Sequence, residues 1–302
     1  AHTIWEARTL AETAKKKKLV TQMGTQIHAG DNYRRVVEMI RKGVIGAVKE
    51  VHVWVGGAWN GNGKRPEEKA VPKGLDWDLW VGPAKMRPYA SEYVPFHWRR
   101  YWAFGGGRMA DMACHHTDLP FWALDLRYPT KVSAEGSPIT PETCADWIVC
   151  QYDFPARGKQ PPVKLTWYDG DKRPKYFAEG KLPKWGDGTL FVGEKGMLLA
   201  GYSQRLLLPE ADFKGIDGDG SIPKSLGHHK EFVEACKTGG ATTCNFDYSG
   251  ALTEAILLGV VSYRVGKPLE WDPATLKCKG VPEADQLIHK EYRKGWEVAG
   301  LS

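Results

Sequence analysis

The sequence predicts a mixed α/β protein, in which part of a doubly wound α/β domain precedes a larger α/β domain with a large, mostly antiparallel, open sheet. The first 56 residues follow the order helix, strand, helix, strand, which is the pattern of a doubly wound sheet but too short for a complete one. Residues 130–210 change to short apolar strands separated by turn sequences. A chain of 302 residues suits one large domain or two unequal ones. We place the boundary between residues 46 and 47.

Helix caps and hydrophobic periodicity predict the N-terminal elements. Thr3 and Glu6 have the spacing of a capping box, which marks the start of a helix. A short apolar run ends at Gly24, and we interpret it as a buried strand. Gly43 is a stop signal for a second helix. The expected elements are a helix over about 3–16, a strand over 19–23, a helix from Asp31 or Asn32 to Gly43, and a strand over about 48–56.

The remainder of the chain begins with a long irregular segment. Residues 57–104 are rich in Gly, Pro, Trp and Tyr, and loops of this length inside compact domains are usually functional. A helix is expected to follow the three glycines at 105–107 and to end near residue 125. The predicted strands are 131–135, 146–154, 163–168, 189–192, 197–200 and 205–208. The predicted later helices are 227–238, 248–265 and an amphipathic segment at 283–294, and the last segment, about 283–302, is a candidate for packing back on the first domain.

Charge and aromatic content limit the kinds of partner that the protein is expected to bind. The net charge is +6, but the basic residues are spread along the chain and no nucleic-acid motif is present, so we expect no nucleic-acid partner. The chain has 13 Trp and 12 Tyr. Such side chains suit sugar faces and subunit interfaces, and they also fill large sheet cores. Trp77, Trp80 and Trp102 are therefore candidates either for stacking on a sugar or for sealing an interface.

Cysteine spacing and hydropathy give a second set of bounds. The six cysteines include no C-x-x-C pair, so reduced thiols are expected rather than a disulfide framework. No apolar run reaches the roughly 18 residues of a membrane span, so we expect no membrane partner. No signal peptide is visible, and the chain begins at Ala1 without Met. Localisation stays open between the cytoplasm and, if an upstream signal was removed, the periplasm.

One helix carries the residues suited to chemistry. Asp111, His115 and Asp118 stand at positions i, i+4 and i+7, which places them on one helical face. A histidine titrates near neutrality and can take a proton from a hydroxyl, and a neighbouring carboxylate can orient its ring. The pattern therefore suits oxidation of a secondary alcohol, although a helix cap beside an ordinary polar histidine remains an alternative. We expect no metal on His115 and His116, because adjacent helical residues diverge by about 100°.

The run G-G-G-x-x-x-D-x-x-x-H-x-x-D at 105–118 resembles the signature helix of the Gfo/Idh/MocA oxidoreductases. The resemblance implies that His115 is the catalytic histidine, that Asp111 is its orienting partner, and that Asp118 faces the sugar. Further similar stretches are 20–28, 42–46, Trp98-Arg99, 246–254 and 266–271, so the similarity extends over nearly the whole chain.

Other side chains become candidates through position or resemblance. His28, Tyr33 and Arg34 follow Gly24 at the carboxyl edge of the expected first sheet, where α/β folds bind ligands. His228 precedes a helix near a family pocket, and it is also compatible with an ordinary polar helix start. The candidates for substrate binding are Asp118, His28, Tyr33, Arg34, Trp102 and His228, and those implied for cofactor binding are Gln26, Trp98 and Arg99.

The chain departs from the family pattern at its beginning. Family members start with a strand and a G-x-G-x-x-G turn that binds pyrophosphate, and no such turn is present here. The family also has a Glu-Lys-Pro motif with a catalytic Lys, and residues 1–7 resemble the helix that directly follows it. The resemblance thus implies that this chain lacks most of the domain that binds NAD or NADP. We expect the 302 residues alone to bind NAD(P) poorly.

Three interpretations remain open. The first is an NAD(P)-dependent oxidoreductase that acts on a secondary hydroxyl of a sugar, cyclitol or glycoside. The second is a glycosidase- or lyase-type enzyme of the same family that oxidises its sugar transiently with bound NAD. The third is a non-catalytic assembly or binding module. The resemblance also implies homodimers or homotetramers formed through the open sheet face.

Overall fold

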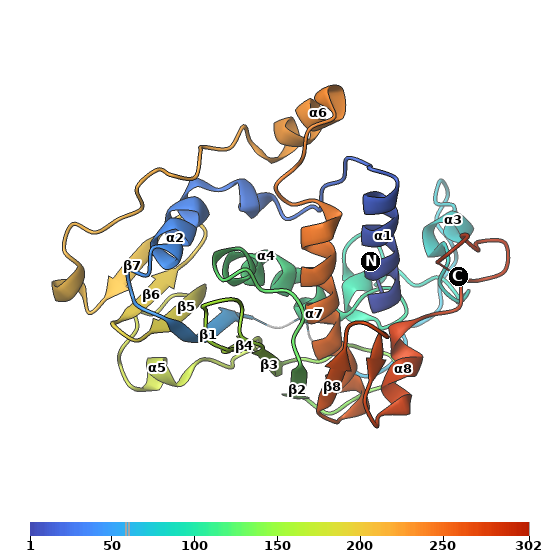
Figure 1. The fold of residues 1–302 in the computed structure, drawn as a ribbon. Coiled ribbons are helices and arrows are strands. Elements are labelled where there is room, and N and C mark those ends of the chain that lie inside the picture. Colours follow the sequence, from blue (N-terminus) through green and yellow to red (C-terminus); the bar gives the residue numbers. More distant parts are fainter. Residues whose placement is uncertain (58, 60, 302) are drawn as a thin grey trace.

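The computed structural model describes residues 1–57, 59 and 61–301 and contains a nine-stranded mixed sheet (Figure 1). The strands lie in the order β7-β6-β5-β1-β4-β3-β2-β8-β9. Their bounds are β1 Val48–Val55, β2 Lys131–Gly136, β3 Ile148–Phe154, β4 Val163–Tyr168, β5 Asp187–Gly193, β6 Met197–Ala200, β7 Arg205–Leu208, β8 Leu269–Asp272 and β9 Lys277–Cys278. In the described part of the chain, β1 and β4 are the one parallel pair, and the other neighbours are antiparallel. The predicted open and mostly antiparallel sheet is confirmed.

Helices cover one face of this sheet. The α-helices are α1 Ile4–Lys16, α2 Asp31–Arg41, α3 Trp77–Val81, α4 Gly107–Ala123, α5 Lys175–Ala178, α6 His228–Thr238, α7 Phe246–Val265 and α8 Pro282–Ile288, and the 3₁₀ helices are η1 Gln26–Ala29, η2 His97–Arg100 and η3 Glu210–Phe213. Both α4 and α7 pack on the sheet and on each other, while α1 packs on α7 and α2 packs on α4 (Figure 1). The candidate helix α4 therefore lies between the sheet and the other helices.

The two faces of the sheet are buried differently. Val51 and Val53 of β1 point into the main core beneath the helices, and both are fully buried. On the opposite face, Trp54 packs in a smaller cluster with Tyr176 and Leu190, beside α5. Farther along this face, polar residues of β2, β3 and β4 remain exposed, namely Lys131, Glu135, Gln151 and Lys164. Assembly into dimers or tetramers through this face stays a prediction.

The predicted strand over 19–23 is wrong. The segment has no β-ladder with any described residue, and the Leu19 side chain is 55% exposed. Its one backbone bond to a distant part of the chain runs from the N–H of Met23 to the carbonyl of Cys244, at 3.0 Å. A strand needs a neighbour along its length to satisfy its backbone groups. Residues 1–46 therefore contribute helices and no strand, and the domain boundary at residue 46 stays a prediction.

Other boundaries follow the sequence closely. The capping box of α1 is formed as predicted, since Thr3 accepts a bond from the N–H of Glu6 and the Glu6 side chain accepts one from the N–H of Thr3. Neither Asp31 nor Asn32 caps α2, because that helix begins after Gly30 without a side-chain cap. The last helix is shorter than expected and ends at Ile288.

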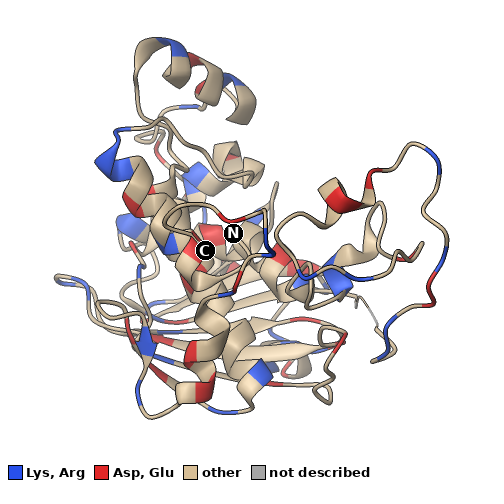
Figure 2. Cartoon of the chain, turned by 90° about the vertical axis from the view of Figure 1, so that its right-hand side faces the viewer, with Lys and Arg blue, Asp and Glu red and all other residues tan. Residues whose placement is uncertain are grey.

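Charge and hydropathy can be followed on the folded chain. On the side shown in Figure 2, acidic and basic residues interleave over the helices and loops. Among the described helices, none is both long and apolar enough to cross a membrane.

Candidate active site

The three glycines before α4 bring two chain segments into close contact. A Cβ on Gly105 would lie 2.9 Å from the Cα of Arg99, and one on Gly107 would lie 2.8 Å from the Cβ of Cys144. Gly107 also has a φ of +74°, which glycine adopts without strain. The absence of side chains here lets the η2 segment lie directly against the start of α4.

This close approach places Arg99 beside Asp111. The Nε of Arg99 donates to Oδ2 of Asp111 at 3.3 Å, and both side chains are partly exposed. The Arg99 guanidinium also stacks over Trp98, 4.4 Å from the ring centroid. The predicted Trp98-Arg99 pair thus holds the carboxylate of Asp111, which points it toward solvent at the first turns of α4.

His115 lies one turn farther along α4 and is half-buried. Its backbone carbonyl accepts a bond from the hydroxyl of Tyr33 at 3.4 Å. Its imidazole makes no hydrogen bond with any of the described side chains or backbone groups, whereas Asp111 is bonded to Arg99. An imidazole in this state can still exchange a proton with a bound ligand. Whether Asp111 orients His115 stays a prediction.

Asp118 has a different environment from Asp111. Its side chain is 0% exposed, and both carboxylate oxygens lie 2.9 Å from Nδ1 of His28. The Tyr248 hydroxyl donates to Oδ1 of Asp118 at 2.7 Å. The His28 ring stacks on Trp122 with centroids 4.2 Å apart. The three residues predicted to lie in file along α4 are therefore divided, with Asp111 and His115 partly accessible and Asp118 bonded inside the protein.

Arg34 and His228 surround His28. The Nη1 of Arg34 donates to the carbonyl of His28 at 2.8 Å, and burial lowers the pKa of this guanidinium. His228 lies 2.8 Å from the side-chain amide of Gln22, and burial also lowers its pKa. The structure thus brings three of the predicted substrate residues to one end of α4.

Two predicted site residues lie apart from this group. Trp102 donates from Nε1 to the carbonyl of Thr140 at 3.1 Å and lies under the guanidinium of Arg264. Gln26 is exposed at the start of η1. Trp77 and Trp80 stack on each other, with ring centroids 4.8 Å apart.

The interpretation from sequence missed three residues at the site. Tyr248 bonds Asp118, while Tyr202 stacks on His116 with centroids 4.6 Å apart. The one sequence signal for His116 is its place beside His115, and Tyr202 follows a glycine in a strand-to-strand turn. Neither pattern is specific enough to indicate a site.

One buried cluster has the donor atoms of a metal site. Ligand atoms of His28, Asp118 and Cys244 all lie within 4.8 Å of one another. The hydrogen bonds from His28 and Tyr248 already satisfy the carboxylate of Asp118, so the cluster is explained without an ion. The expectation that the chain has no metal site stays a prediction.

The burial of His116 predicts that the folded protein becomes less stable in acid. Burial lowers its pKa to about 3, so the folded protein keeps this imidazole neutral while the unfolded chain protonates it below about pH 6.5. The unfolded state then binds the extra proton, and stability falls as the pH drops from about 6.5 toward 3. When the pH is lowered from about 7.5 to about 5, the His116 imidazole should reduce the free energy of unfolding by about 2 kcal/mol.

Urea denaturation of wild type and His116→Gln at both pH values measures this contribution. The variant should lose about 2 kcal/mol less than the wild type on acidification. Equal losses would show that His116 is not kept neutral by the fold.

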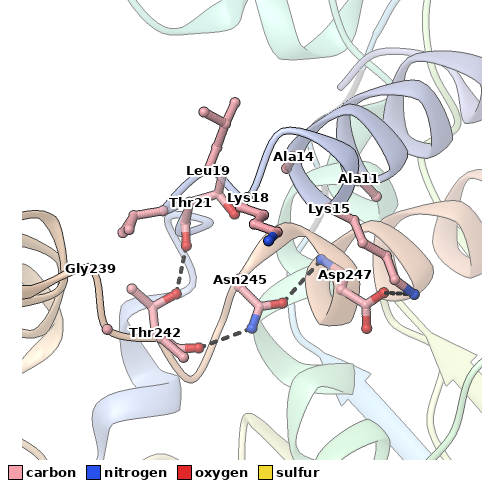
Figure 3. A pocket seen from close by; sticks show the side chains of 13 residues that line it. Ala11, Ala14, Lys15, Lys18, Leu19, Thr21, Gly239, Thr242, Asn245 and Asp247 are labelled. Atoms are coloured by element: carbon pink, nitrogen blue, oxygen red, sulfur yellow. Dashed lines mark hydrogen bonds and ion pairs between the residues drawn. The ribbon is translucent and has the colours of Figure 1, made fainter.

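A separate hollow of about 390 Å³ lies where the end of α1, the end of α6 and the start of α7 meet (Figure 3). Asn245 caps α7 there by accepting bonds from the N–H groups of Asp247 and Tyr248. Lys15 and Lys18 contribute to the rim. No predicted site residue is among the described residues that line this hollow, and the Asn245 side chain is committed to the cap.

Comparison with known proteins decides the family. The model of the Gfo/Idh/MocA oxidoreductase family, C-terminal alpha/beta domain, matches residues 32–184, which is about half of the chain. The chain belongs to this family. The matched Gfo/Idh/MocA segment contains the strands β1 to β4 and the helix α4, which carries Asp111, His115 and Asp118.

Solved structures with the Gfo/Idh/MocA fold resemble the chain at low sequence identity. A levoglucosan dehydrogenase in complex with NADH and L-sorbose has 13% identity and a TM-score of 0.57, covering 89% of this chain and 70% of its own. GenD2 from gentamicin A biosynthesis, in complex with NAD, has 16% identity and a TM-score of 0.54, covering 90% and 69%. An aldose–aldose oxidoreductase from Caulobacter crescentus, complexed with glycerol, has 14% identity and a TM-score of 0.50, covering 89% and 69%. No curated protein matches the chain.

Proposed function

We propose that the intact protein is an NAD(P)-dependent oxidoreductase that acts on a secondary hydroxyl of a sugar, cyclitol or glycoside. The observation that supports this most is the half-buried imidazole of His115, which has no hydrogen-bond partner among the described groups and stands one helical turn from the Arg99-bound Asp111. An acid–base group and a fixed carboxylate side by side suit removal of a hydroxyl proton. Solved relatives named for levoglucosan and for aldoses make these the first sugars to test.

In this proposal His115 accepts the hydroxyl proton of the substrate through a ring nitrogen. Asp111 stabilises the imidazolium that forms, and Arg99 keeps the Asp111 carboxylate in place through the hydrogen bond that its Nε donates. The nicotinamide, when bound, supplies the acceptor for the hydride that leaves the same carbon. The half-buried position of His115 restricts bulk water around the transferred proton.

The 302 residues include groups suited to contact the nicotinamide of such a cofactor, but not the glycine turn that usually binds its phosphates. Trp98 and Arg99 lie beside Asp111, where they can contact the nicotinamide side. The sequence contains no G-x-G-x-x-G turn, so the groups that bind pyrophosphate in doubly wound domains are not among these residues. No step is therefore assigned to phosphate binding.

The activity itself is tested by mixing the intact protein with NAD⁺ or NADP⁺ and a panel of aldoses, anhydro sugars and cyclitols. Formation of NAD(P)H in proportion to oxidised sugar is the expected result. Release of sugar from a glycoside without net consumption of NAD⁺ would instead favour the glycosidase-type alternative. If neither reaction occurs with any member of the panel, the proposed function is contradicted.

The 302-residue chain by itself should bind NAD(P) weakly. Without glycine-turn amides to contact the pyrophosphate, we expect a dissociation constant of about 1 mM or weaker. Calorimetric titration with NAD⁺ and NADP⁺ measures it directly. Saturation in the low micromolar range would show that other residues of this chain hold the phosphates.

A further inference from the structure

The turn between β6 and β7 is fixed against α2 by one buried side chain. The side-chain amide of Asn32 donates to the carbonyls of Gly201 and Gln204 at 2.9 Å and 3.0 Å. Its oxygen accepts a bond from Arg205 at 2.8 Å. Every polar group of the Asn32 side chain is therefore engaged in holding this turn, although turns between strands are usually mobile and solvated.

The fixed turn places the ring of Tyr202 over α4. One face of the ring stacks on His116, with centroids 4.6 Å apart and planes 19° apart. The rings of Tyr202 and Tyr33 pack edge to face, with centroids 6.1 Å apart. The Tyr33 hydroxyl in turn donates to the backbone carbonyl of His115. Tyr202 thus contacts two neighbours of the candidate acid–base residue, namely His116, which follows His115 on α4, and Tyr33, whose hydroxyl bonds the His115 carbonyl.

Tyr202 differs from its neighbours in accessibility. Its side chain is 37% exposed, whereas His116 is 2% exposed and Tyr33 is 1% exposed. Burial raises the pKa of Tyr202, and the charges of Asp187, Asp118 and Asp111 raise it further. The hydroxyl therefore stays protonated at neutral pH and can both donate and accept a hydrogen bond.

These observations identify a half-exposed aromatic ring with a neutral hydroxyl that packs on His116, the residue that follows His115 on α4. The apolar face of a sugar ring packs on such a surface, and its hydroxyls pair with the phenol and with nearby carboxylates.

We propose that Tyr202 contacts the carbohydrate ring held next to His115 and helps to select which sugar binds. This inference rests on the proposed function, because it assumes a carbohydrate substrate at that histidine. It adds a residue from the β6–β7 turn to a site otherwise built from α4, η1, η2 and α2.

The test is calorimetric titration of the intact protein, in the presence of NAD⁺, with D-glucose, levoglucosan and myo-inositol. Tyr202→Ala should weaken the best-bound sugar by at least about tenfold, because it removes both the ring and the hydroxyl. Tyr202→Phe keeps the stacking on His116 and should weaken binding less, by about threefold to tenfold. The matched control is Tyr128→Ala, since Tyr128 is partly exposed and its ring contacts Arg8 away from α4.

The outcomes separate this inference from the proposed function. If wild type binds a sugar and Tyr202→Ala binds it equally well, the role of Tyr202 is overturned while the oxidoreductase proposal stands. If wild type binds none of the three sugars, the carbohydrate assignment fails and this inference fails with it. Equal weakening by Tyr128→Ala would show a general loss of structure and would also overturn the specific role.

Discussion

Replacing His115 by alanine should lower turnover at least about a hundredfold in the intact protein. A positioned general acid–base contributes roughly 10²–10⁴-fold to a rate, and the half-buried imidazole of His115 has no hydrogen-bond partner among the described residues. Substrate affinity should change much less, because His115 interacts with the departing proton in the transition state and contributes little to binding of the substrate itself. The measurement is steady-state oxidation of the best sugar found in the panel.

A matched control separates chemistry from folding. His289 is an exposed histidine at the end of α8 whose ring contacts Trp5, so His289→Ala should leave turnover unchanged. His115→Ala should also keep the unfolding midpoint close to that of the wild type, because no described hydrogen bond of the imidazole is lost. Turnover within about threefold of wild type would remove His115 from the mechanism.

Local sequence signals predicted the elements around α4 well. A helix start depends on residues three apart, so the capping box of α1 could be read from Thr3 and Glu6. The β4, β6 and β7 strands are short runs rich in apolar residues and flanked by turn residues, and their predicted bounds agree with the structure. The helix expected after the three glycines is also present, as α4.

The errors arose where distant residues decide the outcome. Residues 19–23 have the composition of a buried strand, but a strand also needs a partner, which the described chain does not provide. The environment of Asp118 is set by Tyr248, which is 130 residues away, and by His28, which is 90 residues away. Helical spacing placed Asp118 on the same face as Asp111 and His115, but it could not show that this face enters the interior as α4 proceeds.

Removing the carboxylate of Asp118 should destabilise the protein by about 3 kcal/mol. In Asp118→Ala the Nδ1 of His28 loses its partner in a fully buried position, and the Tyr248 hydroxyl keeps only its bond to the backbone carbonyl of residue 118, at 3.0 Å. Leaving a buried polar group unpaired costs about 1–3 kcal/mol, and breaking a buried ion pair costs about 3–5 kcal/mol. The free energy of unfolding in urea measures the effect.

Asp125 provides the contrast, because it lies just beyond the end of the same helix in an exposed ion pair with Arg41 at 2.9 Å. The φ of Asp125 is +51°, which asparagine tolerates better than alanine, so Asp125→Asn is the matched control and should change the free energy of unfolding by less than about 1 kcal/mol. Asp118→Asn keeps the size of the side chain and part of its accepting capacity, so it should fall between the two. If Asp118→Asn folds normally and raises the KM for sugar, Asp118 contacts substrate as the family resemblance implies. If it lowers stability and leaves KM unchanged, the carboxylate serves to fix His28 and α7 against the helix that carries His115.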